Sequence, residues 1–175
     1  MIKKKNNKKI DKKAQEIFGL SFGMIFSIIL IIFFIVVAFI VIKHFLSIQN
    51  CSKIGIFIND IEEEVERAWN SNDQSVEFKG YLPSGIKKVC FANVSESFRG
   101  ADKEIGTYID IYIDKNMFLY PLNKACDMAK YSLPHIDVNW ITRTNNPYCI
   151  DVIKGKVLMI IEKNSNDRLV KIIKK

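Results

Sequence analysis

The sequence predicts an α+β protein, in which one long N-terminal helix, first transmembrane and then amphipathic, packs on an antiparallel β-sheet head. Three observations predict this fold. Residues 17–42 form a run of 26 residues without a charged side chain. From residue 51 onward, apolar residues recur every three or four positions, which is typical of an amphipathic helix. From residue 74 onward, short alternating runs separated by turn residues indicate strands.

The positive charge is concentrated at the N-terminus. The net charge is +7, and residues 1–13 contain seven lysines and one acid, whereas the rest of the chain has 19 basic and 18 acidic residues. A short basic tail beside a hydrophobic span favours cytoplasmic retention. We therefore expect residues 1–14 to be a basic cytoplasmic leader, and we expect no nucleic-acid partner.

The apolar run predicts a membrane helix over residues 15–43. As a helix, 26 residues would extend about 39 Å, whereas the hydrocarbon core of a bilayer is about 30 Å thick. An ordinary cleaved signal has a shorter apolar core followed by small residues. The lysines precede the span, with only Lys43 and Lys53 soon after it. This bias predicts a single-pass protein of the cell membrane, with a cytoplasmic N-terminus, an extracytoplasmic head and lipid as a partner.

The start of the helix carries a family resemblance. Lys12-Lys13-Ala14-Gln15-Glu16, followed at once by the apolar run, resembles the N-terminus of archaeal type IV pilin-like proteins with a class III signal peptide. The resemblance implies that a prepilin peptidase cuts between Ala14 and Gln15 and leaves the helix on the mature protein. Residues 22–29 and 146–150 are also similar to small uncharacterised pilin-like proteins of archaea with reduced genomes.

Several residues of the apolar run are candidates for assembly. Many pilins carry a glutamate at the fifth mature position; Gly19 stands there in this chain, and Glu16 stands at the second. The resemblance implies that Glu16 neutralises the terminal amine of a neighbouring subunit. Gly19 and Gly23 form a GxxxG pattern, which Ser27 extends by one turn, and such stripes permit close helix approach in lipid. Small residues are also common in membrane helices that do not associate.

Residues 44–72 predict an amphipathic helix that continues into the head. Its apolar stripe packs on the protein's own sheet or, alternatively, forms a coiled coil. Asn70-Ser71-Asn72-Asp73 ends the helix. The stripe consists of Cys51, Ile54, Ile58, Ile61, Val65 and Ala68.

Residues 73–175 predict a β-rich extracytoplasmic domain. The strongest alternation, over residues 107–114, places Ile109, Ile111 and Ile113 on one face and Tyr108, Asp110, Tyr112 and Asp114 on the other. Residues 150–153 and 157–161 predict a hairpin around Lys154-Gly155. Further strands are expected around Val76 and Phe78 and at 86–91, 117–120 and 169–173. Residues 121–147 predict a long irregular stretch.

The four cysteines predict two disulfides in an exported head. We expect Cys51 to pair with Cys90 and Cys126 with Cys149; four buried thiols or a zinc site are the alternatives. Asn93-Val94-Ser95 is a glycosylation sequon in a loop, and Asn50-Cys51-Ser52 is a second one in a helix.

The residues offer little for catalysis. The chain has two histidines and no nucleophile, phosphate-loop or zinc-protease motif. Asp110 and Asp114 would lie about 13 Å apart on a strand, too far for paired acid–base work; Tyr108 and Tyr112 beside them would form a binding strip or ordinary surface packing. We expect no catalytic residue, metal or cofactor.

The sequence therefore favours a membrane-anchored pilin-like structural or adhesion subunit that assembles with other pilin-like subunits through its N-terminal helix. A non-polymerising, single-pass anchored domain for extracytoplasmic binding or sensing is the alternative, and an exported enzyme is a third candidate.

Overall fold

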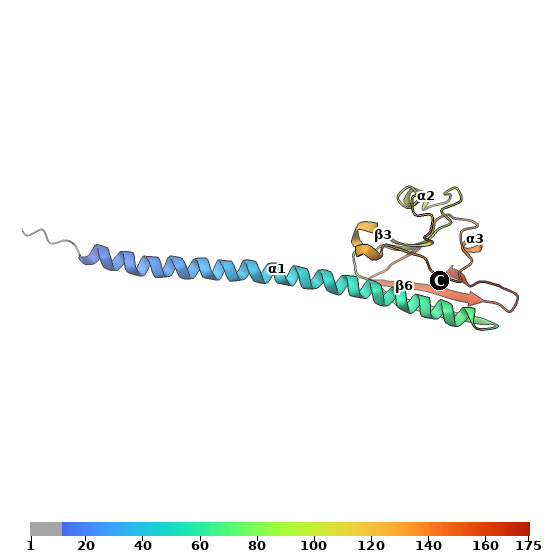
Figure 1. The fold of residues 1–175 in the computed structure, drawn as a ribbon, viewed down its shortest axis with the longest axis horizontal. Helices are drawn as coiled ribbons and strands as arrows, with labels where there is room; N and C mark the ends of the chain where they lie inside the picture. The colour runs from blue at the N-terminus through green and yellow to red at the C-terminus, as the bar shows by residue number, and fades with distance from the viewer. Residues whose placement is uncertain (1–11) are drawn as a thin grey trace, which may run out of the picture. The chain divides into compact units, whose positions relative to one another are not determined.

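The computed structural model describes the backbone of residues 12–175 and the side chains of residues 23–175 (Figure 1). The chain divides into two compact units, Met1–Leu46 and Ser47–Lys175, and helix α1 contributes to both. The predicted α+β class is confirmed. The elements are α1 (Lys12–Trp69), β1 (Gln74–Tyr81), β2 (Lys88–Phe91), α2 (Lys103–Gly106), β3 (Met117–Tyr120), η1 (Leu122–Lys124), η2 (Cys126–Met128), β4 (Lys130–Tyr131), α3 (Val138–Ile141), β5 (Tyr148–Asp151), β6 (Lys156–Lys163) and β7 (Lys171–Lys174).

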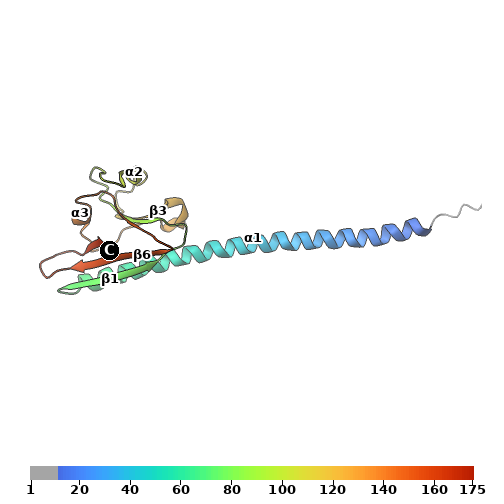
Figure 2. The ribbon, with the colours of Figure 1, turned by 180° about the vertical axis from the view of Figure 1, so that it is seen from behind.

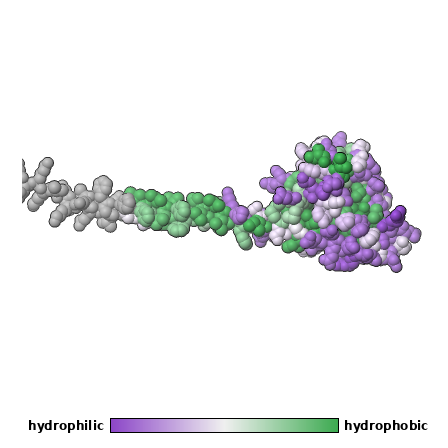
Figure 3. Space-filling model, viewed as in Figure 1, coloured by the Kyte–Doolittle hydropathy of each residue, from purple (hydrophilic) through white to green (hydrophobic). Residues whose placement is uncertain are grey.

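The first unit contains an apolar segment of α1, which we define as residues 23–42. All of its side chains are exposed, and this segment forms the green stretch of Figure 3. The helix is long and apolar enough to cross a membrane. Its Ile, Val and Phe side chains would be costly to leave in water, whereas hydrocarbon solvates them and enforces backbone hydrogen bonding.

The second unit, which we call the head, is built on the C-terminal part of α1. Ile54, Ile61, Val65 and Ala68 have no exposed surface, and Ile58 is also buried. They join the strands in one hydrophobic core, so the stripe packs on the protein's own sheets, as one of the two alternatives predicted. The helix ends at Trp69, and the hydroxyl of Ser71 donates to the carbonyl of Ala68 at 2.8 Å.

A three-stranded antiparallel sheet lies along this helix, in the order β1-β6-β7 (Figure 2). Strands β1 and β6 pair over eight positions, with Phe78 opposite Met159. Both side chains are buried, and Phe78 contacts Phe57 of the helix at a ring-centroid distance of 6.1 Å. The predicted strand around residues 76–78 is therefore confirmed, with its apolar face on the helix.

A four-stranded antiparallel sheet has the order β4-β3-β2-β5. The predicted hairpin around Lys154-Gly155 is wrong, although the turn forms. Strand β5 pairs with β2 while β6 pairs with β1 and β7, so the two strands belong to different sheets. The bridge between Ile153 and Lys156 is isolated, because each strand finds a longer partner elsewhere.

The predicted strand over residues 107–114 is also wrong. Helix α2 ends at Gly106, and the chain continues in turns that bond locally, with the amide of Tyr108 donating to the carbonyl of Ile105 at 3.1 Å. Ile109 is buried, but Ile111 and Ile113 are 72% and 76% exposed. The backbone of this segment forms local turn hydrogen bonds instead of pairing with a strand, and only one of the three alternating isoleucines lies in the core.

Candidate functional site

Four of the predicted processing and assembly residues fall outside the described side chains: Ala14, Gln15, Glu16 and Gly19. Gly23 and Ser27 are described. A side chain at Gly23 would meet nothing within 4 Å, so this face of the helix is open. The hydroxyl of Ser27 donates to the carbonyl of Gly23 at 2.8 Å. In hydrocarbon, this bond satisfies the hydroxyl without a partner helix, and the missing side chain at Gly23 leaves room for one.

The four cysteines form two disulfides, but the expected pairing is wrong. Cys51 pairs with Cys126, and Cys90 pairs with Cys149. Cys90 and Cys149 are directly opposite each other because β2 pairs with β5, a partnership that the hairpin prediction had assigned elsewhere. The other disulfide joins Cys51 on α1 to Cys126 in η2.

The sequon residue Asn93 is half-buried. Its side-chain amide donates to Oδ1 of Asn139 at 2.8 Å, and its Oδ1 accepts from the amide of Ser95 at 3.0 Å. Glycosylation of Asn93 stays a prediction, and it would require a change in the contact with Asn139.

Asn146 is a structural residue that sequence reasoning missed. It is fully buried, and its side-chain amide donates to the carbonyl of Asn93 at 2.8 Å while its Oδ1 accepts from the amide of Asn93 at 3.1 Å. Its backbone exchanges two hydrogen bonds with Arg99. Asn146 therefore joins the loop after β2 to the start of β5. The one feature of the sequence that had drawn attention to Asn146 was its place in the segment 146–150, which is similar to small pilin-like proteins.

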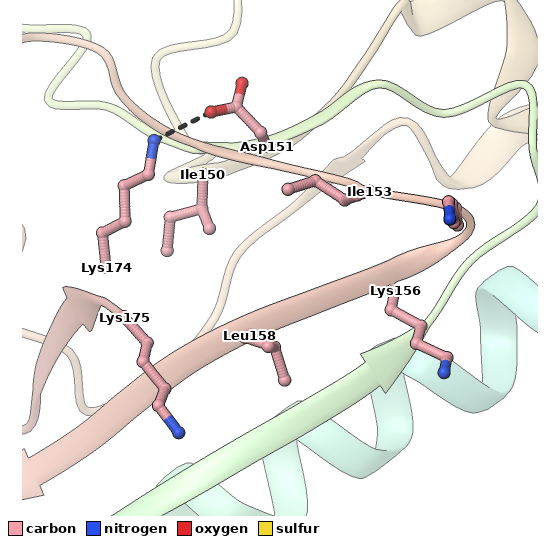
Figure 4. A pocket seen from close by; sticks show the side chains of 8 residues that line it. Ile150, Asp151, Ile153, Lys156, Leu158, Lys174 and Lys175 are labelled. Carbon is pink, nitrogen blue, oxygen red and sulfur yellow. Dashed lines mark hydrogen bonds and ion pairs between the residues drawn. The ribbon is translucent and has the colours of Figure 1, made fainter.

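A cleft with an apolar floor lies where β5 and β6 diverge (Figure 4). We call it the lysine cleft. Its volume is about 330 Å³, and Ile150, Ile153 and Leu158 supply apolar surface. Ile150 is buried, whereas Ile153 is 68% exposed and Leu158 is 38% exposed. The cleft exists because the two strands around the Lys154-Gly155 turn enter different sheets.

Four lysines border this cleft: Lys154, Lys156, Lys174 and Lys175. Lys174 donates to Asp151 at 2.8 Å, and this hydrogen bond holds the pKa of Asp151 below its ordinary value. Lys175 pairs with Glu77. Within residues 23–175, no carboxylate pairs with Lys154 or Lys156. The border therefore keeps an uncompensated positive charge next to an apolar floor.

An exposed apolar segment follows α2, and we call it the isoleucine loop, residues 107–114. Tyr108 is 61% exposed, and Asp110 and Asp114 are exposed near it. The side chain of Asp114 accepts from Lys115, which lowers the pKa of Asp114. Tyr112 instead packs near Phe118. Tyr112 is half-buried, and the strand that would have placed it beside Tyr108 does not form, so the binding-strip alternative loses its basis.

A polar cavity of about 610 Å³ lies beside the end of α1. Here Trp69 stacks on His135 at a ring-centroid distance of 3.7 Å, and Nε2 of His135 lies 3.5 Å from Glu66. Asp137 is already used as the N-cap of α3, where it accepts from the amide of Trp140. Across the part of the chain that the structure describes, no group of three or more His, Cys, Asp or Glu residues could hold a metal ion.

Comparison with known proteins adds no relative. The chain matches no protein-family model, no curated protein and no solved structure.

Proposed function

We propose that this chain is a membrane-anchored, pilin-like structural or adhesion subunit that assembles through its N-terminal hydrophobic helix. One observation carries the proposal. A single helix, α1, exposes only apolar or small side chains over residues 23–42 and then supplies the buried stripe Ile54–Ala68 to the head. A helix shared in this way between lipid and a folded head suits a subunit that packs laterally.

In this proposal, lipid is the solvent for the apolar segment, the basic leader stays in the cytoplasm, and the head lies outside. A prepilin peptidase removes residues 1–14, and Gln15 becomes the new terminus. The carboxylate of Glu16 then neutralises the terminal amine of a neighbouring copy. The open face at Gly23 lets two helices approach closely, which in lipid favours association through packing. The two disulfides suit an oxidising exterior.

Mass spectrometry of the full chain, expressed in membranes with a prepilin peptidase, tests the processing step. We expect a mature chain that begins at Gln15. Chemical cross-linking of the same membranes tests assembly. Gly23→Ile should lower the dimer yield because it fills the open face. The control Val36→Phe also adds bulk to the exposed apolar segment, but it lies about 220° around the helix from Gly23 and should leave the yield unchanged. An intact Met1 together with a monomeric chain would contradict the proposal.

The second candidate is an anchored binding or sensory domain that does not polymerise. The bond from Ser27 to Gly23 favours it, because the hydroxyl then needs no partner helix. The two candidates differ in the same measurements. A plain anchor keeps residues 1–14 and gives the same cross-linking yield with Gly23→Ile as with Val36→Phe.

A further inference from the structure

The three most exposed large apolar side chains among residues 23–175 belong to only two features of the head. Ile113 (76% exposed) and Ile111 (72%) lie in the isoleucine loop, and Ile153 (68%) lies in the lysine cleft. They are more exposed than any large apolar residue in the described part of α1, where Phe45 has the highest value, 65%. Clustered exposed apolar surface of this kind marks an interaction site.

The two features carry opposite charge. In the isoleucine loop Asp110 is exposed and has no cationic partner within the described residues, and Asp114 is also exposed. In the lysine cleft Lys154 and Lys156 have no carboxylate partner within the same residues. An apolar segment flanked by acids thus matches an apolar floor bordered by lysines. Charge complementarity of this type steers association and fixes register.

We propose that the isoleucine loop of one copy docks in the lysine cleft of a second copy. Ile111 and Ile113 then cover the floor formed by Ile153 and Leu158, while Asp110 faces Lys156. The cleft volume of about 330 Å³ lies at the lower end of the range of ligand cavities, about 300–1,000 Å³, and suits side chains rather than a large ligand. This inference rests on the proposed function, and it names the contact between heads.

The geometry of the contact has a consequence for assembly. No residue of the isoleucine loop borders the lysine cleft, so the contact joins two different surfaces and is heterologous. In a dimer, a heterologous contact leaves a free loop at one end and a free cleft at the other. Further copies then extend it into an open filament, or close it into a ring if the two ends meet. Each pair of neighbouring copies would then be joined by two contacts, one between their helices in lipid and one between the loop and the cleft of their heads.

A zero-length carbodiimide cross-link tests the contact directly, because it joins a carboxylate only to an amine that touches it. The full chain is prepared in two isotopic forms, mixed in lipid vesicles and cross-linked. We expect peptides that join Asp110 or Asp114 of one isotope to Lys154 or Lys156 of the other. Wild-type protein that forms dimers without any such mixed peptide would overturn the inference.

Variants give the second arm. We expect at least an about tenfold lower yield of the mixed cross-link from the double variant Ile111→Ser with Ile113→Ser, and also from Ile153→Ser alone. A tenfold loss in affinity corresponds to about 1.4 kcal/mol, and the apolar surface that these side chains bury in the contact contributes at least that much. The matched control Ile56→Ser changes an isoleucine of the head helix that is 57% exposed and lies in neither feature; it should change nothing. These side chains are all largely exposed, so the head should stay folded, which circular dichroism checks.

Charge exchange separates this inference from the proposed function. Asp110→Lys and Lys156→Glu should each weaken the mixed cross-linking of whole chains by a bifunctional amine reagent, and the two together should restore it. If these variants and the serine variants leave association at the wild-type level while Gly23→Ile lowers it, the helix-assembly function stands and the loop-in-cleft contact is wrong. If the wild-type chain is monomeric in vesicles and keeps Met1, both proposals fail.

Discussion

Tyr131 donates a 2.5 Å hydrogen bond to Oε2 of Glu62 and so joins strand β4 to the head part of α1. The pKa of Tyr131 is raised to about 12 from an ordinary 10.0. The hydrogen bond to Glu62 is the largest cause, and burial and the charge of Glu62 add to it. The folded state therefore holds the phenol proton more tightly than the unfolded state. The resulting stabilisation is fully present below pH 10.0 and is lost as the pH rises through about 12.

We predict that Tyr131→Phe lowers the free energy of unfolding by about 1–2 kcal/mol below pH 10.0. Hydrogen bonds to charged groups contribute about 1.5–3 kcal/mol, and partial exposure of both partners reduces the value. Urea unfolding of the full chain in detergent measures the loss. In a pH titration followed by tyrosinate absorbance, the variant should also lack the transition near pH 12 that belongs to Tyr131. Tyr81→Phe, at a residue 57% exposed, is the control; an equal effect of both changes would contradict the prediction.

The helix was predictable because its signals are local. An uncharged run and a three–four spacing require no knowledge of other segments. The prediction missed Phe57, which is buried one position before Ile58. Phe57 widens the buried face toward β1, where Gly80 leaves space for its ring. That space depends on a contact between distant segments, so spacing along the helix could not reveal it.

Strand pairing was less predictable because it depends on distant partners. The Lys154-Gly155 turn has the positive φ angles, 52° and 75°, that favour a tight hairpin. Its flanking strands nevertheless enter separate sheets, and the lysine cleft arises from that divergence. The alternation over residues 107–114 also looked like a strand, but only Ile109 is buried. Both features of the proposed head contact lie where local patterns and tertiary structure disagree.

We predict that peptide mapping without reduction will recover Cys51 linked to Cys126 and Cys90 linked to Cys149. Each disulfide closes a long segment, with separations of 75 and 59 residues. Each should therefore contribute about 4 kcal/mol in the chain-entropy model. A peptide that links Cys51 to Cys90 would contradict the structure.

Replacing both cysteines of one pair by alanine should lower the melting temperature, and the Cys90–Cys149 pair should show the larger effect. Cys90 has no exposed surface and Cys149 is 9% exposed, so their truncation also leaves a cavity. Cys126 is exposed, and its loss leaves less empty space. Thermal unfolding of the two double variants in detergent makes the comparison; an equal or reversed order would show that burial does not decide it.

We predict that Gly80→Ala destabilises the head by about 1–3 kcal/mol, the usual cost of overpacking. A Cβ at Gly80 would lie 2.5 Å from Cδ2 of Phe57, whose ring is buried and cannot move aside. Gly85→Ala is the matched control, because its Cβ would meet Lys124 at an ordinary 3.5 Å. Urea unfolding should separate the two variants clearly. Similar stability of both would mean that β1 can shift away from the helix.

We predict that Asn146→Ala lowers the free energy of unfolding by about 1–3 kcal/mol. The change removes the donor to the carbonyl of Asn93 and the acceptor for the amide of Asn93. The amide of Asn93 would be left without its acceptor, whereas the carbonyl of Asn93 still accepts from the amide of Glu96 at 3.2 Å. A buried unsatisfied group costs about 1–3 kcal/mol. The control is Asn123→Ala, at an exposed position, where a change within about 0.5 kcal/mol is expected.

Hydrogen exchange gives the Asn146 prediction a local signature. The amide of Asn93 bonds to the side chain of Asn146 in the native fold, so in Asn146→Ala it should lose protection before the amides of β6. Strand β6 is held from both sides by β1 and β7 and does not depend on this loop. Uniform loss of protection across the head would instead indicate global unfolding, and it would show that Asn146 stabilises the whole fold rather than the junction between the loop and β5.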